Sequence, residues 1–183
     1  VLPVWSNEAT GLPGMAGIGD IVAIPDPGRF HILPWVDDTA WIQADIYHRD
    51  GTPSPLDTRA IAGRANAALT KAGLQFRAGL EIEAHVYRLD AKALTPADIG
   101  QPGTPPDVTV LNRGYQLLTE HYADTLDPVL SLIRDTCDAL AIPIRSLEVE
   151  FGPSQIEFTC GARPGIGAAD DMVLLRSALR QAL

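Results

Sequence analysis

Two segments of the chain alternate between polar and apolar residues with a period of two, which is typical of β-strands with one buried face. They are residues 79–89 and 148–158. Along the first, Glu81, Glu83 and His85 fall on one side, and the residues between them are all apolar. The pattern therefore predicts two strand segments that each carry acidic side chains on a single face.

The second segment contains its own turn signal, because Gly-Pro-Ser at residues 152–154 has the chemistry of a tight turn. A hairpin there brings Glu150 close to Gln155 and Glu157. Like charges on one sheet face repel, and a divalent cation such as Mg²⁺ or Mn²⁺ would turn that repulsion into attraction. Alternating glutamates are also typical of a solvated outer face, so the pattern alone leaves both interpretations open.

The first 55 residues are rich in Pro, Gly and β-forming residues, and they predict strands rather than helices. The pattern predicts strands at residues 21–24 and 40–47, and residues 30–33 are a weaker candidate for a strand. Asp50 and Gly51 mark a turn after the second of these.

From about residue 56 the apolar positions follow a helical period. Asp57 is a candidate N-cap and Gly73 a candidate stop for the first helix. A strand at 77–89 follows, and then a Pro/Gly/Thr-rich stretch at about 90–108 that we expect to be a flexible loop.

The remaining pattern predicts a helix, a strand, the hairpin and a last helix. Asp127 and Pro128 resemble an N-cap and a first-turn proline, so we expect the helix to begin there and to end before Pro143. The fold class is therefore α+β.

Composition restricts the partners of this chain. Its 183 residues carry a formal net charge of -9 and have a pI near 4.7, which argues against nucleic-acid or anionic-membrane partners. No apolar run approaches the roughly 20 residues of a membrane span, and no signal peptide is visible. We therefore expect a cytoplasmic protein, in which Cys137 and Cys160 act as small buried apolar residues.

Several motifs together resemble the glutamine synthetase superfamily. The sequence Gly79-Leu-Glu-Ile-Glu83, followed by Glu150-Phe-Gly-Pro-Ser-Gln-Ile-Glu157, carries the resemblance. Further stretches resemble the family in the same order and extend the likeness over almost the whole chain: residues 19–27, 33–35, 50–53, 56–59, 113–115 and 168–170.

The resemblance implies a domain organisation. Residues 1–55 would be the latter part of an N-terminal β-grasp domain. Residues 56–183 would be the first half of a catalytic domain built from an antiparallel sheet with helices. Family members are more than twice as long, so we expect an internal piece of a longer protein, inactive as a ligase by itself. The intact parent would be a ring-shaped homo-oligomer.

The resemblance also implies a chemistry. In the family, ATP phosphorylates the side-chain carboxylate of glutamate, and an amine or ammonia displaces the phosphate. Carried over by position, Glu83, Glu150 and Glu157 match the ligands of one Mg²⁺ or Mn²⁺ near the glutamate and the amine. Glu81 matches one ligand of a second metal at the nucleotide phosphates. The resemblance assigns no catalytic or nucleotide-binding residue within these 183 residues.

The sequence departs from the family pattern in two places that bear on the site. His85 stands where the family has a bulky aromatic residue, and it would either approach the metal or remain an ordinary exposed histidine. The region that holds the ammonium-site Asp in glutamine synthetases corresponds to residues 5–10, which contain no Asp. We therefore favour an organic amine slightly over ammonia. The alternatives are glutamine synthetase proper and a non-catalytic structural or regulatory subunit.

Overall fold

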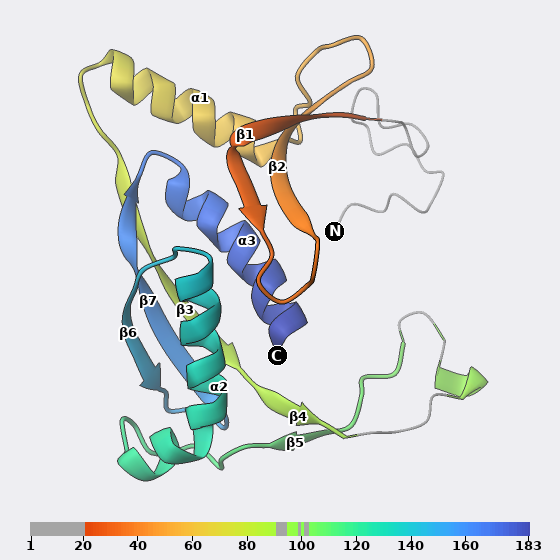
Figure 1. The fold of residues 1–183 in the computed structure, drawn as a ribbon, viewed down its shortest axis with the longest axis vertical. Coiled ribbons are helices and arrows are strands. Elements are labelled where there is room, and N and C mark those ends of the chain that lie inside the picture. The colour runs from red at the N-terminus through yellow and green to blue at the C-terminus, as the bar shows by residue number, and fades with distance from the viewer. Residues whose placement is uncertain (1–20, 91–94, 99, 101–102) are drawn as a thin grey trace. The chain divides into compact units, whose positions relative to one another are not determined.

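The computed structural model describes residues 21–90, 95–98, 100 and 103–183. Helices and strands are mixed along the chain, as an α+β fold requires (Figure 1). In chain order the elements are β1 (Val22–Ile32), β2 (Ala40–Tyr47), α1 (Thr58–Lys71), β3 (Arg77–His85), β4 (Tyr87–Leu89), the 3₁₀ turn η1 (Pro96–Asp98), β5 (Val108–Val110), α2 (Glu120–Ala139), β6 (Ile144–Val149), β7 (Gln155–Pro164) and α3 (Gly167–Ala182). The described strands form three sheets, in the orders β1-β2, β3-β7-β6 and β4-β5.

The chain divides into two compact units. Among the described residues, the first unit comprises those up to 78 together with 163–170, and the second comprises those from 79 to 162 together with 171–183. The boundaries fall inside β3, β7 and α3, so each of these elements contributes to both units. The boundary at residue 55 between a β-grasp domain and a catalytic domain is a different division, and it stays a prediction.

The first unit contains the antiparallel hairpin of β1 and β2. The two strands expected at 21–24 and 30–33 are one strand, and its pairing register shifts between Pro25 and Phe30. Prolines 25 and 27 have no N–H to donate, and the N–H of Gly28 bonds to the Asp26 side chain at 2.9 Å instead of to β2. The interruption that the sequence suggests is therefore a bulge within one strand.

Helix α1 begins as its sequence predicts. The carboxylate of Asp57 accepts the N–H of Ala60 at 3.0 Å and, with its other oxygen, the N–H of Ile46 in β2 at 2.8 Å. One side chain thus caps the helix and ties it to the neighbouring strand. At the other end Gly73 has φ of 75°, the left-handed conformation in which glycine has no steric penalty.

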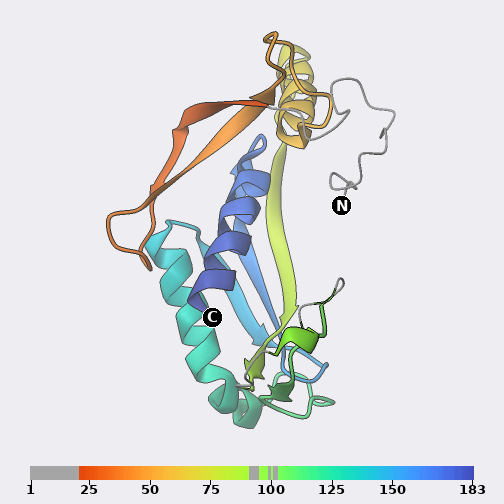
Figure 2. The same cartoon turned by 90° about the vertical axis from the view of Figure 1, so that its right-hand side faces the viewer.

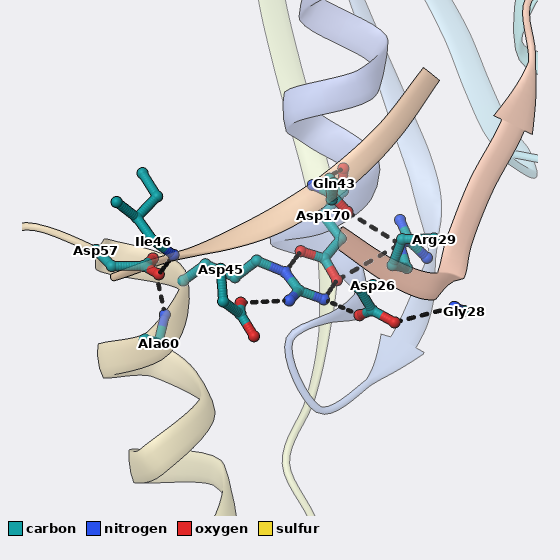
Figure 3. A network of polar contacts seen from close by, with 10 residues as sticks. Asp26, Gly28, Arg29, Gln43, Asp45, Ile46, Asp57, Ala60 and Asp170 are labelled. Carbon is teal, nitrogen blue, oxygen red and sulfur yellow. Dashed lines mark hydrogen bonds and ion pairs between the residues drawn. The ribbon is translucent and has the colours of Figure 1, made fainter. Parts of the chain in front are cut away.

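An ion-pair network joins the hairpin to the first turn of α3 within this unit, and Figure 3 shows its geometry. The guanidinium of Arg59 contacts Asp170 through Nε at 2.9 Å, Asp45 through Nη1 at 2.7 Å and Asp26 through Nη2 at 2.6 Å. Arg29 lies 3.5 Å from the same Asp170 carboxylate. Because the side chain of Asp170 is only 6% exposed, its charge depends on these partners.

The second unit is built on the three-stranded sheet. Strands β6 and β7 pair antiparallel. Val86 donates to Ser154 at 3.0 Å near one end of β3, and Gly79 lies beside the Cys160 carbonyl near the other. Strand β3 is therefore also antiparallel to β7.

Helix α2 and the later turns of helix α3 lie on one face of this sheet (Figures 1 and 2). The side chains between the helices and the sheet form the core of the unit. Its most deeply buried members are Leu126, Ile133, Cys137, Ile142, Ile156, Phe158, Leu174, Leu175 and Ala178. Burial raises the pKa of the Cys137 thiol to about 12, so this cysteine stays protonated and serves as a packing residue.

Residues 77–89 form two strands rather than the single strand expected. β3 ends at His85, and Tyr87–Leu89 leaves the main sheet to pair with β5 as β4. Between residues 90 and 108 the described residues contain only the η1 turn and the start of β5.

The predicted start of the second helix is wrong. α2 begins at Glu120, with Thr119 as N-cap, and runs through Pro128. Pro128 cannot donate to the carbonyl four residues before it, at a typical cost of about 3 kcal/mol. Tyr122 and Leu126 are buried at 8% and 0% exposure, so tertiary packing extends the helix past the proline.

We expect Arg59→Met to lower the free energy of unfolding of the full-length protein by about 2 kcal/mol, because it leaves the buried Asp170 carboxylate with weaker compensation. Urea unfolding at pH 7 measures the change. The control is Arg134→Met, because Arg134 is 53% exposed and its nearest ion-pair partner is 3.9 Å away. Equal stabilities for the two variants would contradict a structural role for the network.

The network also predicts a pH dependence. Hydrogen bonds from Arg59, and then from the Gly28 N–H, hold the pKa of Asp26 below its usual range. A carboxyl with a lowered folded-state pKa contributes its full stabilisation above its ordinary pKa of about 4, and loses it as pH falls through the folded value. Asp26→Asn should therefore lower Tm at pH 7, and the deficit should shrink as pH falls below about 4. The exposed Asp37 provides the control substitution, Asp37→Asn, and a pH-independent deficit would refute the assignment.

Candidate metal centre

The strand alternation places acidic side chains on the face of the β3-β7-β6 sheet opposite the apolar core. Glu148 lies directly across from Glu157 in the β6-β7 pairing, while the neighbouring pair, Val149 and Ile156, is buried. On β3, Glu81 and Glu83 are exposed, and Glu157 on β7 is partly buried. The predicted hairpin and the predicted acidic face are both present in the structure.

Three of the four predicted ligands converge. Glu81, Glu83 and Glu157 each offer a carboxylate oxygen, and these oxygens lie within 4.8 Å of one another. In an octahedral Mg²⁺ shell the metal–oxygen distance is about 2.1 Å, so neighbouring ligand oxygens are about 3 Å apart. A cation bound here would draw the three side chains somewhat closer. The donor set, consisting only of carboxylate oxygens, fits Mg²⁺ or Mn²⁺.

The electrostatics of this face favour a cation. Partial burial raises the pKa of Glu157, and the negative charges of Glu81, Glu150, Glu83 and Glu148 raise it further. Each of these charges makes ionisation of Glu157 harder, so the face carries an electrostatic cost when no cation offsets it.

Glu150 lies at the turn rather than within the converging group. Its N–H donates to the Gln155 carbonyl at 2.9 Å, which confirms the predicted proximity of these two residues. Its carboxylate accepts the N–H of Phe151 at 3.1 Å. The structure thus groups Glu81 with Glu83 and Glu157. The resemblance instead groups Glu150 with Glu83 and Glu157, and it assigns Glu81 to a second metal. The division of ligands between two metals stays a prediction.

Gln155 contributes a contact that the sequence analysis did not assign. Its side-chain amide donates to Glu83 at 2.7 Å and accepts the N–H of Gly152 at 2.8 Å. Nearby, Nδ1 of His85 lies 2.7 Å from the Pro153 carbonyl. The turn sequence at residues 152–154 was the only sequence feature that pointed to Gln155. Its bond to Glu83 spans 72 residues and depends on how β3 and β7 pair.

The turn is also braced by the segment around Arg113. Asn112 Oδ1 accepts the N–H groups of Ser154 and Gly114, both at 3.0 Å. Gly114 has φ of 71°, and a Cβ there would lie 2.6 Å from the Pro153 nitrogen, so only glycine fits this close approach. The glycine of the segment at 113–115 is therefore explained by packing against the turn.

Comparison with known proteins identifies the family of this chain. The sequence model of the family described as "Glutamine synthetase, catalytic domain" matches residues 55–182. The chain belongs to the glutamine synthetase family.

Two relatives are similar to this chain over almost its whole length. Gamma-glutamylanilide synthase of an Acinetobacter species is 36% identical over 170 residues, which are 91% of this chain and 34% of that protein. Glutamine synthetase of Mycobacterium tuberculosis is 30% identical over 185 residues, covering 95% of this chain and 38% of that protein. The chain thus spans little more than a third of the length of these relatives.

A solved structure described as a novel glutamine synthase homolog superposes with a TM-score of 0.67 at 23% identity. The match covers 95% of this chain and 37% of the other. It supports the α+β fold with antiparallel sheets; assignment of the N-terminal part to a β-grasp domain stays a prediction. In the part of the chain that the structure describes, no helix has the length and apolar character to cross a membrane.

We expect Glu157→Gln to weaken Mn²⁺ binding to the full-length protein by at least about tenfold, because an incomplete oxygen shell holds hard cations poorly. Isothermal titration calorimetry with Mn²⁺ measures the affinity. Glu148→Gln is the matched control, since Glu148 shares the face and pairs with Glu157 but is outside the converging group. Equal affinities for the two variants would remove Glu157 from the ligand set.

Proposed function

We propose that the full-length protein is a cytoplasmic, ATP-dependent ligase that joins glutamate to an amine. The product is a γ-glutamyl amide, formed through a γ-glutamyl phosphate. The observation that carries the proposal is the convergence of Glu81, Glu83 and Glu157 on one sheet face, within the segment matched by the catalytic-domain family.

The reaction explains why such a face is useful. Phosphoryl transfer from ATP to glutamate brings the phosphates and the substrate carboxylate together, and all of them are anionic. A divalent cation supplies charge neutralisation and orientation for these oxygens. Glu83, Glu150 and Glu157 would hold Mg²⁺ or Mn²⁺ on the side of glutamate and the amine. Glu81 would contribute to a second metal on the side of the ATP phosphates.

We favour an organic amine as the second substrate. The relative named for anilide synthesis is 36% identical to this chain, against 30% for the mycobacterial glutamine synthetase. Residues 5–10, where the ammonium-site Asp is absent from the sequence, lie outside the described residues. Without a nearby anion, ammonium loses its main attraction, whereas an organic amine gains about 0.8 kcal/mol for each CH₂ group buried. Two such groups are worth about tenfold in binding.

Glutamine synthetase proper is the second candidate, favoured by the description of the matching family and by the 30% identity over 95% of the chain. A non-catalytic structural or regulatory subunit is the third. The retention of four glutamates in the metal motifs favours catalysis over that role. In either catalytic case we expect a ring-shaped homo-oligomer in which neighbouring subunits complete the active sites.

Phosphate release by the full-length protein tests the proposal, with glutamate, ATP and Mg²⁺ and a panel of ammonium, alkyl, diamine and aryl amines. We expect the highest kcat/KM with an organic amine, and we expect Glu157→Gln to lower phosphate release with every amine. The highest kcat/KM with ammonium would instead establish glutamine synthetase activity. If no amine stimulates phosphate release, the catalytic proposal fails and the non-catalytic candidate gains.

A further inference from the structure

The side chain of Gln155 joins the hairpin turn to one of the candidate metal ligands. Its Nε2 donates to Oε2 of Glu83 at 2.7 Å, and its Oε1 accepts the N–H of Gly152 at 2.8 Å. The two bonds fix the orientation of the amide, because a reversed amide would place oxygen against the carboxylate and nitrogen against the N–H. One oxygen of Glu83 is therefore already occupied by a donor.

The turn to which Gln155 is attached is closely held. A Cβ on Gly152 would lie 2.5 Å from Gln155 Oε1 and 2.7 Å from Cε1 of His85, so the turn backbone fits between these two side chains. A carbonyl can only accept, so His85 donates from Nδ1 to the Pro153 oxygen. The His85 ring also stacks on Tyr87, with centroids 6.0 Å apart and planes 22° from parallel.

The opposite side of the turn is held by residues from another segment. Asn112 accepts the N–H of Ser154 at 3.0 Å, and the hydroxyl of Ser154 accepts the N–H of Leu111 at 2.7 Å. Ser154 is fully buried, with φ of 54°, so these bonds maintain a backbone conformation that a non-glycine residue rarely adopts. Gln155 thus connects Glu83 to a rigid support.

We propose that Gln155 is a positioning residue for the metal centre. By donating to Oε2 of Glu83, it fixes the rotation of that carboxylate before a cation arrives. The inference rests on the proposed metal-dependent function, and it adds a residue that acts on the cation only through Glu83.

The expected effect follows from the behaviour of residues that orient metal ligands, whose loss typically costs about 10- to 100-fold in metal affinity. Gln155→Met keeps the approximate length of the side chain and removes both hydrogen bonds. We expect this variant of the full-length protein to bind Mn²⁺ about tenfold or more weakly in calorimetry, and to show an altered Mn²⁺ electron paramagnetic resonance spectrum. The control is Gln181→Met on α3, whose side chain bonds to Ser177 at 3.2 Å and which we expect to bind Mn²⁺ like the parent.

A double-mutant cycle separates positioning from a general structural effect. If Gln155 acts through Glu83, Gln155→Met should add no further loss of Mn²⁺ affinity in a Glu83→Gln background. Additive losses, or parental Mn²⁺ affinity in the single variant, would overturn the inference. If the parent itself binds no Mn²⁺, the proposed metal-dependent function fails first. An unchanged Tm in Gln155→Met, together with weaker binding, would exclude unfolding as the cause.

Discussion

The alternation of apolar and polar residues on β3 and β7 is the constraint on which the candidate metal centre depends. Burial of Ile156 and Phe158 against α2 and α3 fixes which way each strand faces. A register slip of one residue would place glutamates in the core and apolar residues in water, so the pairing is strongly specified. The same burial that stabilises the sheet therefore forces Glu81, Glu83 and Glu157 to share the other face, despite their repulsion.

This arrangement couples the acidic face to the hairpin turn. The carboxylates repel one another, as the raised pKa of Glu157 indicates, so without support their side chains would rotate apart. Gln155 opposes that rotation at Glu83, and the turn that carries Gln155 is fixed by His85 and Asn112. A cation that binds only the folded arrangement would add stability by mass action, and the gain grows with the logarithm of its concentration relative to its Kd. The charge repulsion thus favours an occupied site, while Gln155 opposes the disorder that the repulsion would cause at Glu83.

Residues that are close together in the sequence were sufficient to predict some elements of the fold and insufficient to predict others. The Asp57 cap and the turn at 152–154 depend on residues close in sequence, and the structure has both. The start of α2 could not be predicted in the same way, because burial of Leu126 outweighs the local preference expressed by Pro128. The glutamates, in contrast, were identified by their strand pattern and by resemblance. The contact of Gln155 with Glu83 requires knowing that β3 lies beside β7, which periodicity does not encode.

The acidic face and the choice of amine are physically separate questions. In the proposed reaction, cations bound by these glutamates would neutralise oxygens of glutamate and ATP, which are the same whichever amine follows. Discrimination among amines must come from groups that contact the nitrogen and its carbon substituents, by charge for ammonium and by apolar burial for larger amines. Loss of a ligand such as Glu157 should therefore reduce phosphate release with every amine to a similar degree. A change in the order of preferred amines would instead identify a residue at the amine itself.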